Sequence, residues 1–253
     1  MRRHSRILIP FMVAAGLLLL APNRAFGYSS YESPGGDPVR WLAPRVTVVL
    51  DESLSRLGEI HEIQDSIKDA FGVWTDSVAF PFEVEFVEGE CGAGGVKADG
   101  VSCILVEGAV PASNEEAKAT THVSYAASNG AIIGADVVFY ESAGPWSADG
   151  SDDTQDVFSV ASHEAGHMFG LGHSDVADAR MYPTIATGNQ WGGDLDEDDI
   201  KGAEALYEGV ELDDEAGTMS CTASVAPGRP GSMSPVLVML LVLGLVYVRR
   251  TRP

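Results

Sequence analysis

Apolar residues in the middle of the chain follow two different periods. Between residues 53 and 74 they recur every three or four positions, which predicts an amphipathic helix over Ser53–Trp74. Short runs rich in β-branched residues predict strands at Arg45–Leu50, Glu83–Val87, Ser102–Glu107, Thr121–Ala126 and Ala135–Tyr140. Two more helices are expected over Thr154–Phe169 and Leu195–Tyr207. The pattern therefore predicts one unit of helices and strands from Trp41 to about Tyr207.

Polar residues mark where the last two helices should begin. Asp153 or Thr154 is the expected N-cap of the second helix, with Asp156 in its first turn, where a negative charge is favourable. Asp196 is the expected N-cap of the third helix.

The first 27 residues have the three-part layout of a secretory signal peptide. Met1–Arg6 is basic, Ile7–Leu20 is apolar, and Ala25 and Gly27 are the small residues expected before a cut at Tyr28. An uncleaved membrane anchor is the alternative, but the apolar run is short for a membrane span. We therefore expect an exported protein with a short N-terminal segment over residues 28–40.

The C-terminal end carries a second apolar run. Val236–Val248 is uniformly apolar and is followed by arginines, so residues 236–253 are predicted to be a membrane-spanning or sorting tail. An acidic, then Pro/Gly/Ser-rich tether over residues 211–235 precedes it. Cys221, the apolar run and the terminal arginines resemble the MYXO-CTERM class of bacterial sorting signals. A plain single-span anchor is the alternative.

Charge is spread unevenly over the 253 residues. The formal net charge is −21, and eight of the 16 Lys and Arg residues lie in the two ends, while all 37 Asp and Glu residues lie between them. Such an acidic body is repelled by phosphate backbones, which excludes nucleic-acid binding. The acidic runs Asp149–Asp156, Asp194–Asp199 and Glu211–Glu215 are expected to be solvated loops and helix starts. Calcium ligation by the first two runs is the alternative.

Cysteine usage fits an oxidising compartment. Cys91 and Cys103 are 12 positions apart across a Gly-rich connection, and in an exported protein they can close a disulfide loop. Two free buried thiols are the alternative. Cys221 has no predicted disulfide partner, which is more typical of a processed or modified site than of a core residue.

The chemistry is concentrated in eleven residues that contain three of the six histidines. On a helix, His163 and His167 are one turn apart and can reach the same metal ion. Gly170 can adopt positive φ and end the helix, so that His173 turns back as a third ligand. Three neutral nitrogens with an open fourth position are typical of catalytic zinc, with Glu164 placed to act as the general base.

The run from His163 to His173 resembles the metzincin signature H-E-x-x-H-x-x-G-x-x-H, which is followed by a Met-turn. Ser174 directly after His173, and Met181 eight residues beyond His173, resemble the matrixin subgroup. Astacin-like and serralysin-like relatives have a Tyr two places after the turn methionine, where this chain has Pro183.

The resemblance implies an α+β catalytic domain over residues 41–210, with a five-stranded mixed sheet and three helices. It implies that Met181 forms the apolar floor beneath the histidines, although an ordinary core methionine would fit almost as well. It assigns Tyr182, Pro183 and Thr184 to the wall of a substrate pocket. The substrate backbone would add alongside the strand at Thr121–Ala126.

These features predict an extracellular or surface-tethered zinc metalloendopeptidase. We expect Zn²⁺ as the cofactor, proteins or peptides as substrates, membrane attachment through the tail, and a monomer. No cysteine lies in residues 28–40 to bind the zinc and keep a proenzyme latent. The alternative is an inactive metzincin-like module that binds peptides. The intact Glu164 favours the enzyme.

Overall fold

The computed structural model describes residues 26–91, 99–112, 115–185, 187–188 and 193–212. Residues 1–25 of the predicted signal peptide, the predicted tether beyond residue 212 and the predicted C-terminal tail lie outside the described residues. In the part that is described, no helix is both long and apolar enough to span a membrane.

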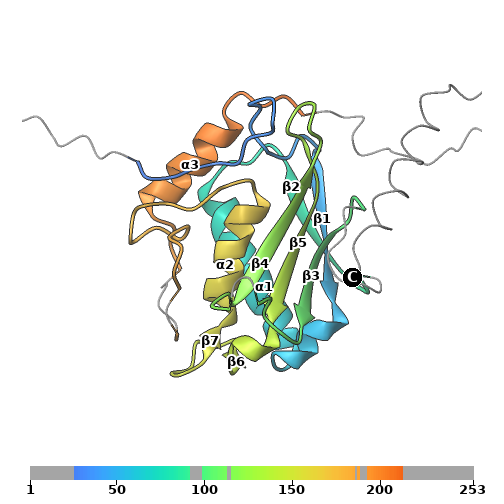
Figure 1. Ribbon diagram of the computed structural model, residues 1–253, viewed down its shortest axis with the longest axis vertical. Helices are drawn as coiled ribbons and strands as arrows, with labels where there is room; N and C mark the ends of the chain where they lie inside the picture. The colour runs from blue at the N-terminus through green and yellow to red at the C-terminus, as the bar shows by residue number, and fades with distance from the viewer. Residues whose placement is uncertain (1–25, 92–98, 113–114, 186, 189–192, 213–253) are drawn as a thin grey trace, which may run out of the picture. The chain divides into compact units, whose positions relative to one another are not determined.

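All five predicted strands are present in one mixed sheet (Figure 1). Its strands are β1 (Arg45–Asp51), β2 (Glu83–Gly89), β3 (Ser102–Glu107), β4 (Ala119–Tyr125) and β5 (Ile132–Tyr140), in the order β2-β1-β3-β5-β4. The neighbouring pairs are parallel except for β4, which runs antiparallel to β5 and forms one edge. β4 and β5 each begin earlier than the sequence pattern predicts, because their antiparallel pairing runs from Ala119 opposite Phe139 to Tyr125 opposite Ile132.

The three predicted α-helices are also present. They are α1 (Ile60–Ser77), α2 (Val157–Met168) and α3 (Glu197–Tyr207). The other elements are two short 3₁₀ helices, η1 (Glu52–Arg56) and η2 (Glu141–Ala143), and the small strand pair β6 (Trp146–Ser147) and β7 (Gln155–Asp156). The predicted α+β fold with a five-stranded mixed sheet and three helices is confirmed.

The prediction of one continuous helix over Ser53–Trp74 was wrong. The segment divides into η1, capped by the Asp51 side chain, and α1, capped by Glu59, whose carboxylate accepts from the backbone N–H of His61 at 3.0 Å. Leu54 and Leu57 are buried although both lie before α1, so the apolar period does not reveal the break.

The predicted start of the second helix was also wrong. Gln155 and Asp156 pair with β6, so the helix begins only at Val157. Asp156 is its N-cap, accepting from the backbone N–H of Ser159 at 3.0 Å, and neither Asp153 nor Thr154 has that role. The local sequence does not decide which of these residues caps the helix, whereas the pairing with β6 does.

The third helix keeps its predicted cap. The Asp196 side chain accepts from the N–H of Asp198 at 2.9 Å and forms a capping box with Asp199. The helix begins at Glu197, two residues later than predicted.

The main core lies between the sheet and the helices. Alternate strand residues face α1 and α2, among them Val48, Ile104, Val137 and Phe139, all at most 1% exposed. The Trp74 indole N–H of α1 donates to the Ser162 carbonyl of α2 at 2.8 Å, which joins the two helices.

A smaller cluster covers the opposite face of the sheet and contains the predicted disulfide. Cys91 and Cys103 are bonded, with Cα atoms 6.0 Å apart, and Cys103 packs with Leu105, Val138 and Tyr140.

Candidate active site

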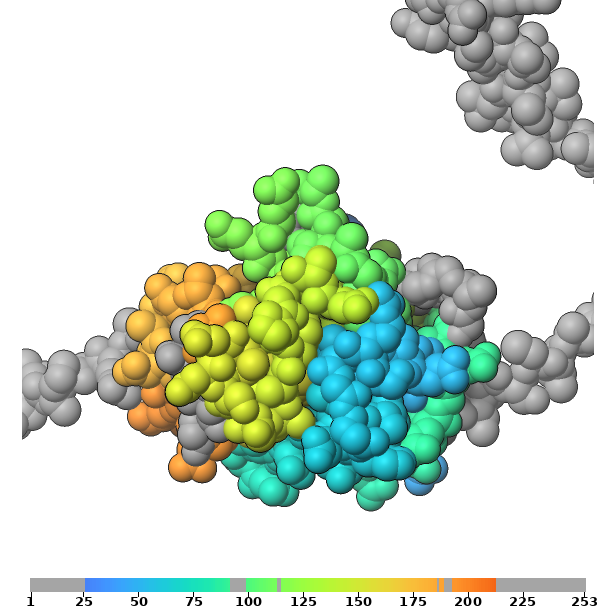
Figure 2. All heavy atoms as spheres, turned by 90° about the horizontal axis from the view of Figure 1, so that it is seen from below, coloured from blue at the N-terminus to red at the C-terminus, as the bar shows by residue number. Residues whose placement is uncertain are grey.

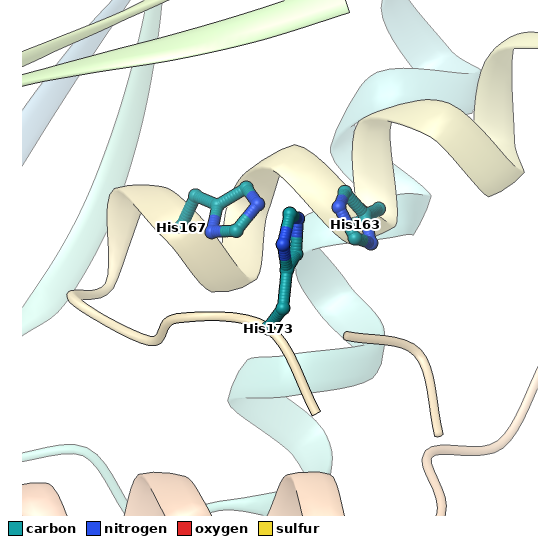
Figure 3. Close-up of side chains that lie close together, drawn as sticks. All are labelled: His163, His167 and His173. Carbon is teal, nitrogen blue, oxygen red and sulfur yellow. The ribbon is translucent and has the colours of Figure 1, made fainter. Parts of the chain in front are cut away.

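The three histidines come together at the end of α2. His163 and His167 project from the helix, and His173 reaches back from the loop that follows it (Figure 3). Their ring centroids are 4.7–5.4 Å apart, and one nitrogen from each ring lies within 4.8 Å of the others. In the part of the chain that the structure describes, this is the one group of three or more His, Cys, Asp or Glu residues close enough to share a metal ion.

Backbone carbonyls orient two of the rings. Nδ1 of His163 lies 2.7 Å from the Arg180 carbonyl, and Nδ1 of His167 lies 2.8 Å from the Leu171 carbonyl. Because a carbonyl oxygen can only accept, each Nδ1 carries the proton, and each Nε2 keeps a free lone pair.

Desolvation lowers the pKa values of all three imidazoles and so favours their neutral form. It lowers the pKa of His163 to about 3. Neutral rings with free lone pairs are the state in which histidine binds a metal.

Gly170 makes the turn that returns His173 to the helix. Its φ is +95°, as expected from the sequence, and its N–H donates to the His167 carbonyl at 3.0 Å. A Cβ at this position would overlap the Val39 carbonyl oxygen.

We expect Gly170→Ala to destabilise the protein by about 2–4 kcal/mol, since a left-handed conformation and a steric overlap both carry a penalty. Gly72→Ala is the matched control. Gly72 lies within α1, and a Cβ there would meet nothing within 4 Å, so this change should stabilise the helix by about 0.5–1 kcal/mol. Urea unfolding of the three proteins measures both effects. Equal stabilities would contradict the strain at Gly170.

Met181 lies directly beneath the helix turn that carries the histidines. It is 1% exposed, and a Cβ on Gly166 would overlap its sulfur atom. The Asp199 carboxylate holds the turn in place, accepting from the N–H groups of Met181 at 3.0 Å and Arg180 at 2.6 Å. α3 therefore positions the Met-turn.

The preceding residue of α3 connects two other segments to the site. One oxygen of Asp198 accepts from the Ser174 hydroxyl at 2.6 Å, and the other accepts from the backbone N–H of Gly27 at 2.6 Å. The N-terminal segment thus packs beside the histidine loop, where the Tyr31 hydroxyl lies 3.3 Å from Nδ1 of His167.

Glu164 is almost fully buried beside the histidines. The Thr121 hydroxyl of β4 donates to its Oε2 at 2.6 Å. Burial raises the pKa of Glu164 to about 7, against the opposing effect of that hydrogen bond. A cation bound by the three imidazoles would favour the ionised carboxylate.

A cleft of about 550 Å³ runs over these groups. Besides Glu164 and the three histidines, it is lined by Tyr31, the start of β4 and the segment after the Met-turn. Pro183, Thr184 and Ile185 line that wall, whereas Tyr182 is not among the lining residues. Lys118 also lines the cleft, and its ammonium donates to the Ile185 carbonyl.

A larger hollow of about 910 Å³ lies away from the histidines. It runs between the start of α1 and the β6–β7 segment, at the end of the molecule that Figure 2 views. Six carboxylates line it: Glu59, Glu62, Asp65, Asp69, Asp149 and Asp156. It contains none of the histidine donors, so the metal chemistry belongs to the smaller cleft. Calcium ligation by the first two acidic runs stays an untested alternative.

Sequence reasoning missed three contributors to the site. Thr121 is an ordinary strand residue by pattern, Tyr31 lies in a segment without periodicity, and Asp199 reads as a helix-start acid. Each acts on residues far away in the chain, so no local spacing could have identified its role.

The mixed sheet, the three helices and the histidine turn above a buried methionine define a metalloprotease domain of the metzincin type. The family model described as Matrixin matches residues 40–208, more than half of the chain. The chain therefore belongs to the matrixin family of peptidases.

Short stretches are similar to known proteinases. The chain is 54% identical over 52 residues to Metalloendoproteinase 2-MMP of Arabidopsis thaliana, covering 21% of this chain and 14% of that protein. It is 51% identical over 51 residues to human Matrix metalloproteinase-20, covering 20% of this chain and 11% of that protein. It is 39% identical over 85 residues to human Matrilysin, covering 34% of this chain and 31% of that protein. The matches thus span less than a third of each of these relatives.

Proposed function

We propose that this protein is an exported zinc-dependent endopeptidase that hydrolyses peptide bonds in proteins or peptides. The observation that carries the proposal is the group of three neutral histidines next to the buried carboxylate of Glu164 in one cleft. Membership of the matrixin family supports the same reaction.

The donor set fits zinc. His163 and His167 have Nδ1 engaged by backbone carbonyls, which leaves Nε2 to bind the metal, and His173 completes a set of three. Carbonyl partners on the far ring nitrogen are the usual way in which proteins orient metal-binding histidines. Three protein donors leave a coordination position for water, as catalytic zinc requires.

When bound, Zn²⁺ would supply Lewis acidity, which lowers the pKa of a coordinated water to about 7. The Glu164 carboxylate accepts a proton from the attacking water as the water oxygen bonds to the peptide carbonyl carbon. As the carbon–nitrogen bond breaks, Glu164 returns that proton to the leaving nitrogen. The carboxylate therefore ends the cycle as it began, ionised and free to act again.

β4 offers the substrate a backbone to pair with. It is an edge strand, bonded to β5 on one side, and its first half lines the cleft. A substrate peptide can add alongside it through main-chain hydrogen bonds. Pro183 and Thr184 then face the side chain after the scissile bond.

We also place the domain outside the cytoplasm. The signal-peptide layout of residues 1–27 and the disulfide between Cys91 and Cys103 support export, and the apolar run with terminal arginines supports tethering. N-terminal sequencing of protein recovered from the cell envelope tests this proposal. A mature chain that begins at Met1 would contradict export by cleavage.

Purified protein is expected to cleave casein, to lose that activity with a zinc chelator, and to regain it when zinc is added back. The activity should reach its maximum at about one zinc per chain, measured by atomic emission. Zinc binding and peptide binding without cleavage would instead indicate an inactive peptide-binding module.

A further inference from the structure

The placement of Thr121 follows from the alternation of side chains along β4. Ala119 and Val123 pack into the core on the helix side of the sheet, so Thr121 between them faces α2. Its neighbour Thr120 faces the other way and accepts a hydrogen bond from the Tyr140 hydroxyl at 3.3 Å. A hydroxyl group is thus presented to α2 from the edge strand of the sheet.

That hydroxyl donates to the carboxylate of Glu164. The distance from Thr121 Oγ1 to Oε2 of Glu164 is 2.6 Å, shorter than the 3.2 Å to the backbone carbonyl of the same residue. A threonine has one hydroxyl proton, and the shorter contact with the charged acceptor is the stronger. Among the described residues, Thr121 is the side chain that donates to this carboxylate.

We propose that Thr121 is a positioning residue for Glu164, which holds Oε2 and leaves Oε1 to accept the proton of the attacking water. The proposal rests on the proposed peptidase function. A general base must lie within about 2.6–3.2 Å of the heavy atom whose proton it removes, and a carboxylate without a fixed partner rotates about its last bond. The Thr121 hydrogen bond fixes the plane of the carboxylate.

Proton balance assigns the two oxygens different tasks. The proton from water goes to Oε1 and then to the leaving nitrogen, while the Thr121 proton stays on Oγ1 throughout. Thr121 therefore acts through Glu164 and exchanges no atom with the substrate.

The location on β4 couples this task to substrate binding. The backbone of Thr121 pairs with Val137 on one side, and the other side of the strand is the sheet edge that a peptide would extend. The strand that aligns the peptide backbone is thus the strand that orients the base. A shift of β4 would move both together.

Three variants test the proposal. Thr121→Val keeps the shape but removes the donor, and kcat should fall about 10- to 100-fold with KM and zinc content unchanged, because hydrogen bonds to charged groups are worth that much. Thr121→Ser keeps the hydroxyl and should restore kcat to within about threefold of the wild type. Thr47→Val, at an exposed position of β1, is the matched control and should leave kcat unchanged.

Infrared spectroscopy separates this proposal from the peptidase function. The carboxylate stretch of Glu164, identified as the band lost in Glu164→Gln, should shift in Thr121→Val but not in Thr121→Ser or Thr47→Val. Wild-type protein that cleaves no peptide would disprove the peptidase function, and the band shift would still decide whether Thr121 holds the carboxylate. An unshifted band in Thr121→Val, a change in KM alone, or an equal loss of kcat in the valine and serine variants would each overturn the proposal.

Discussion

Replacing His163, His167 or His173 with Ala is expected to remove zinc and peptidase activity together. Each ring supplies one of three donors, and two donors in so open a site do not retain the metal. Activity should fall at least about a thousandfold, because the metal supplies several kcal/mol of transition-state stabilisation. Metal analysis and casein hydrolysis on the same preparations measure both losses.

His61→Ala is the control for these variants. His61 is exposed in the first turn of α1 and takes no part in the cleft, so zinc content and activity should stay at wild-type values. Full zinc occupancy in His173→Ala would show that the loop histidine is not a ligand. The site would then be a two-histidine arrangement completed by another group.

Glu164→Gln is expected to lower kcat by about 10²–10⁴-fold while leaving the zinc in place. Glutamine keeps nearly the same shape, and its carbonyl oxygen can still accept from Thr121, but it cannot take a proton at neutral pH. Peptide binding should change little, because backbone pairing with β4 does not involve this side chain. Steady-state kinetics with zinc analysis distinguishes the two effects.

Glu197→Gln, an exposed substitution in the first turn of α3, is the matched control and should leave kcat and zinc content unchanged. Loss of zinc from Glu164→Gln would mean that the carboxylate supports the metal. Unchanged turnover with full zinc would remove the general base from the mechanism.

Local spacing was informative wherever the structure depends on neighbours in the chain. The two histidines four positions apart lie on the same side of α2, and Gly170 turns with positive φ as its position suggested. Asp196 caps α3 because capping is a contact between residues a few positions apart.

Local spacing was misleading where a tertiary contact overrode it. α2 begins at Val157 rather than near Thr154, because Gln155 and Asp156 are drawn into pairing with β6. The predicted first helix breaks before Glu59, and Leu54 and Leu57 are buried on the preceding 3₁₀ helix and at its C-cap.

The sequence by itself determined the strands, the three helices and the chemical character of the site, because alternation, helical period and motif spacing all act within a few residues. Only the tertiary structure brought Thr121 to Glu164 across 43 positions, and Asp199 to Met181 across 18. Those contacts depend on the strand order, which places β4 at the edge of the sheet beside α2, and on the packing of α3 beneath the Met-turn. Such an arrangement depends on how the faces of the sheet and the helices pack against each other, and no local sequence pattern predicts it.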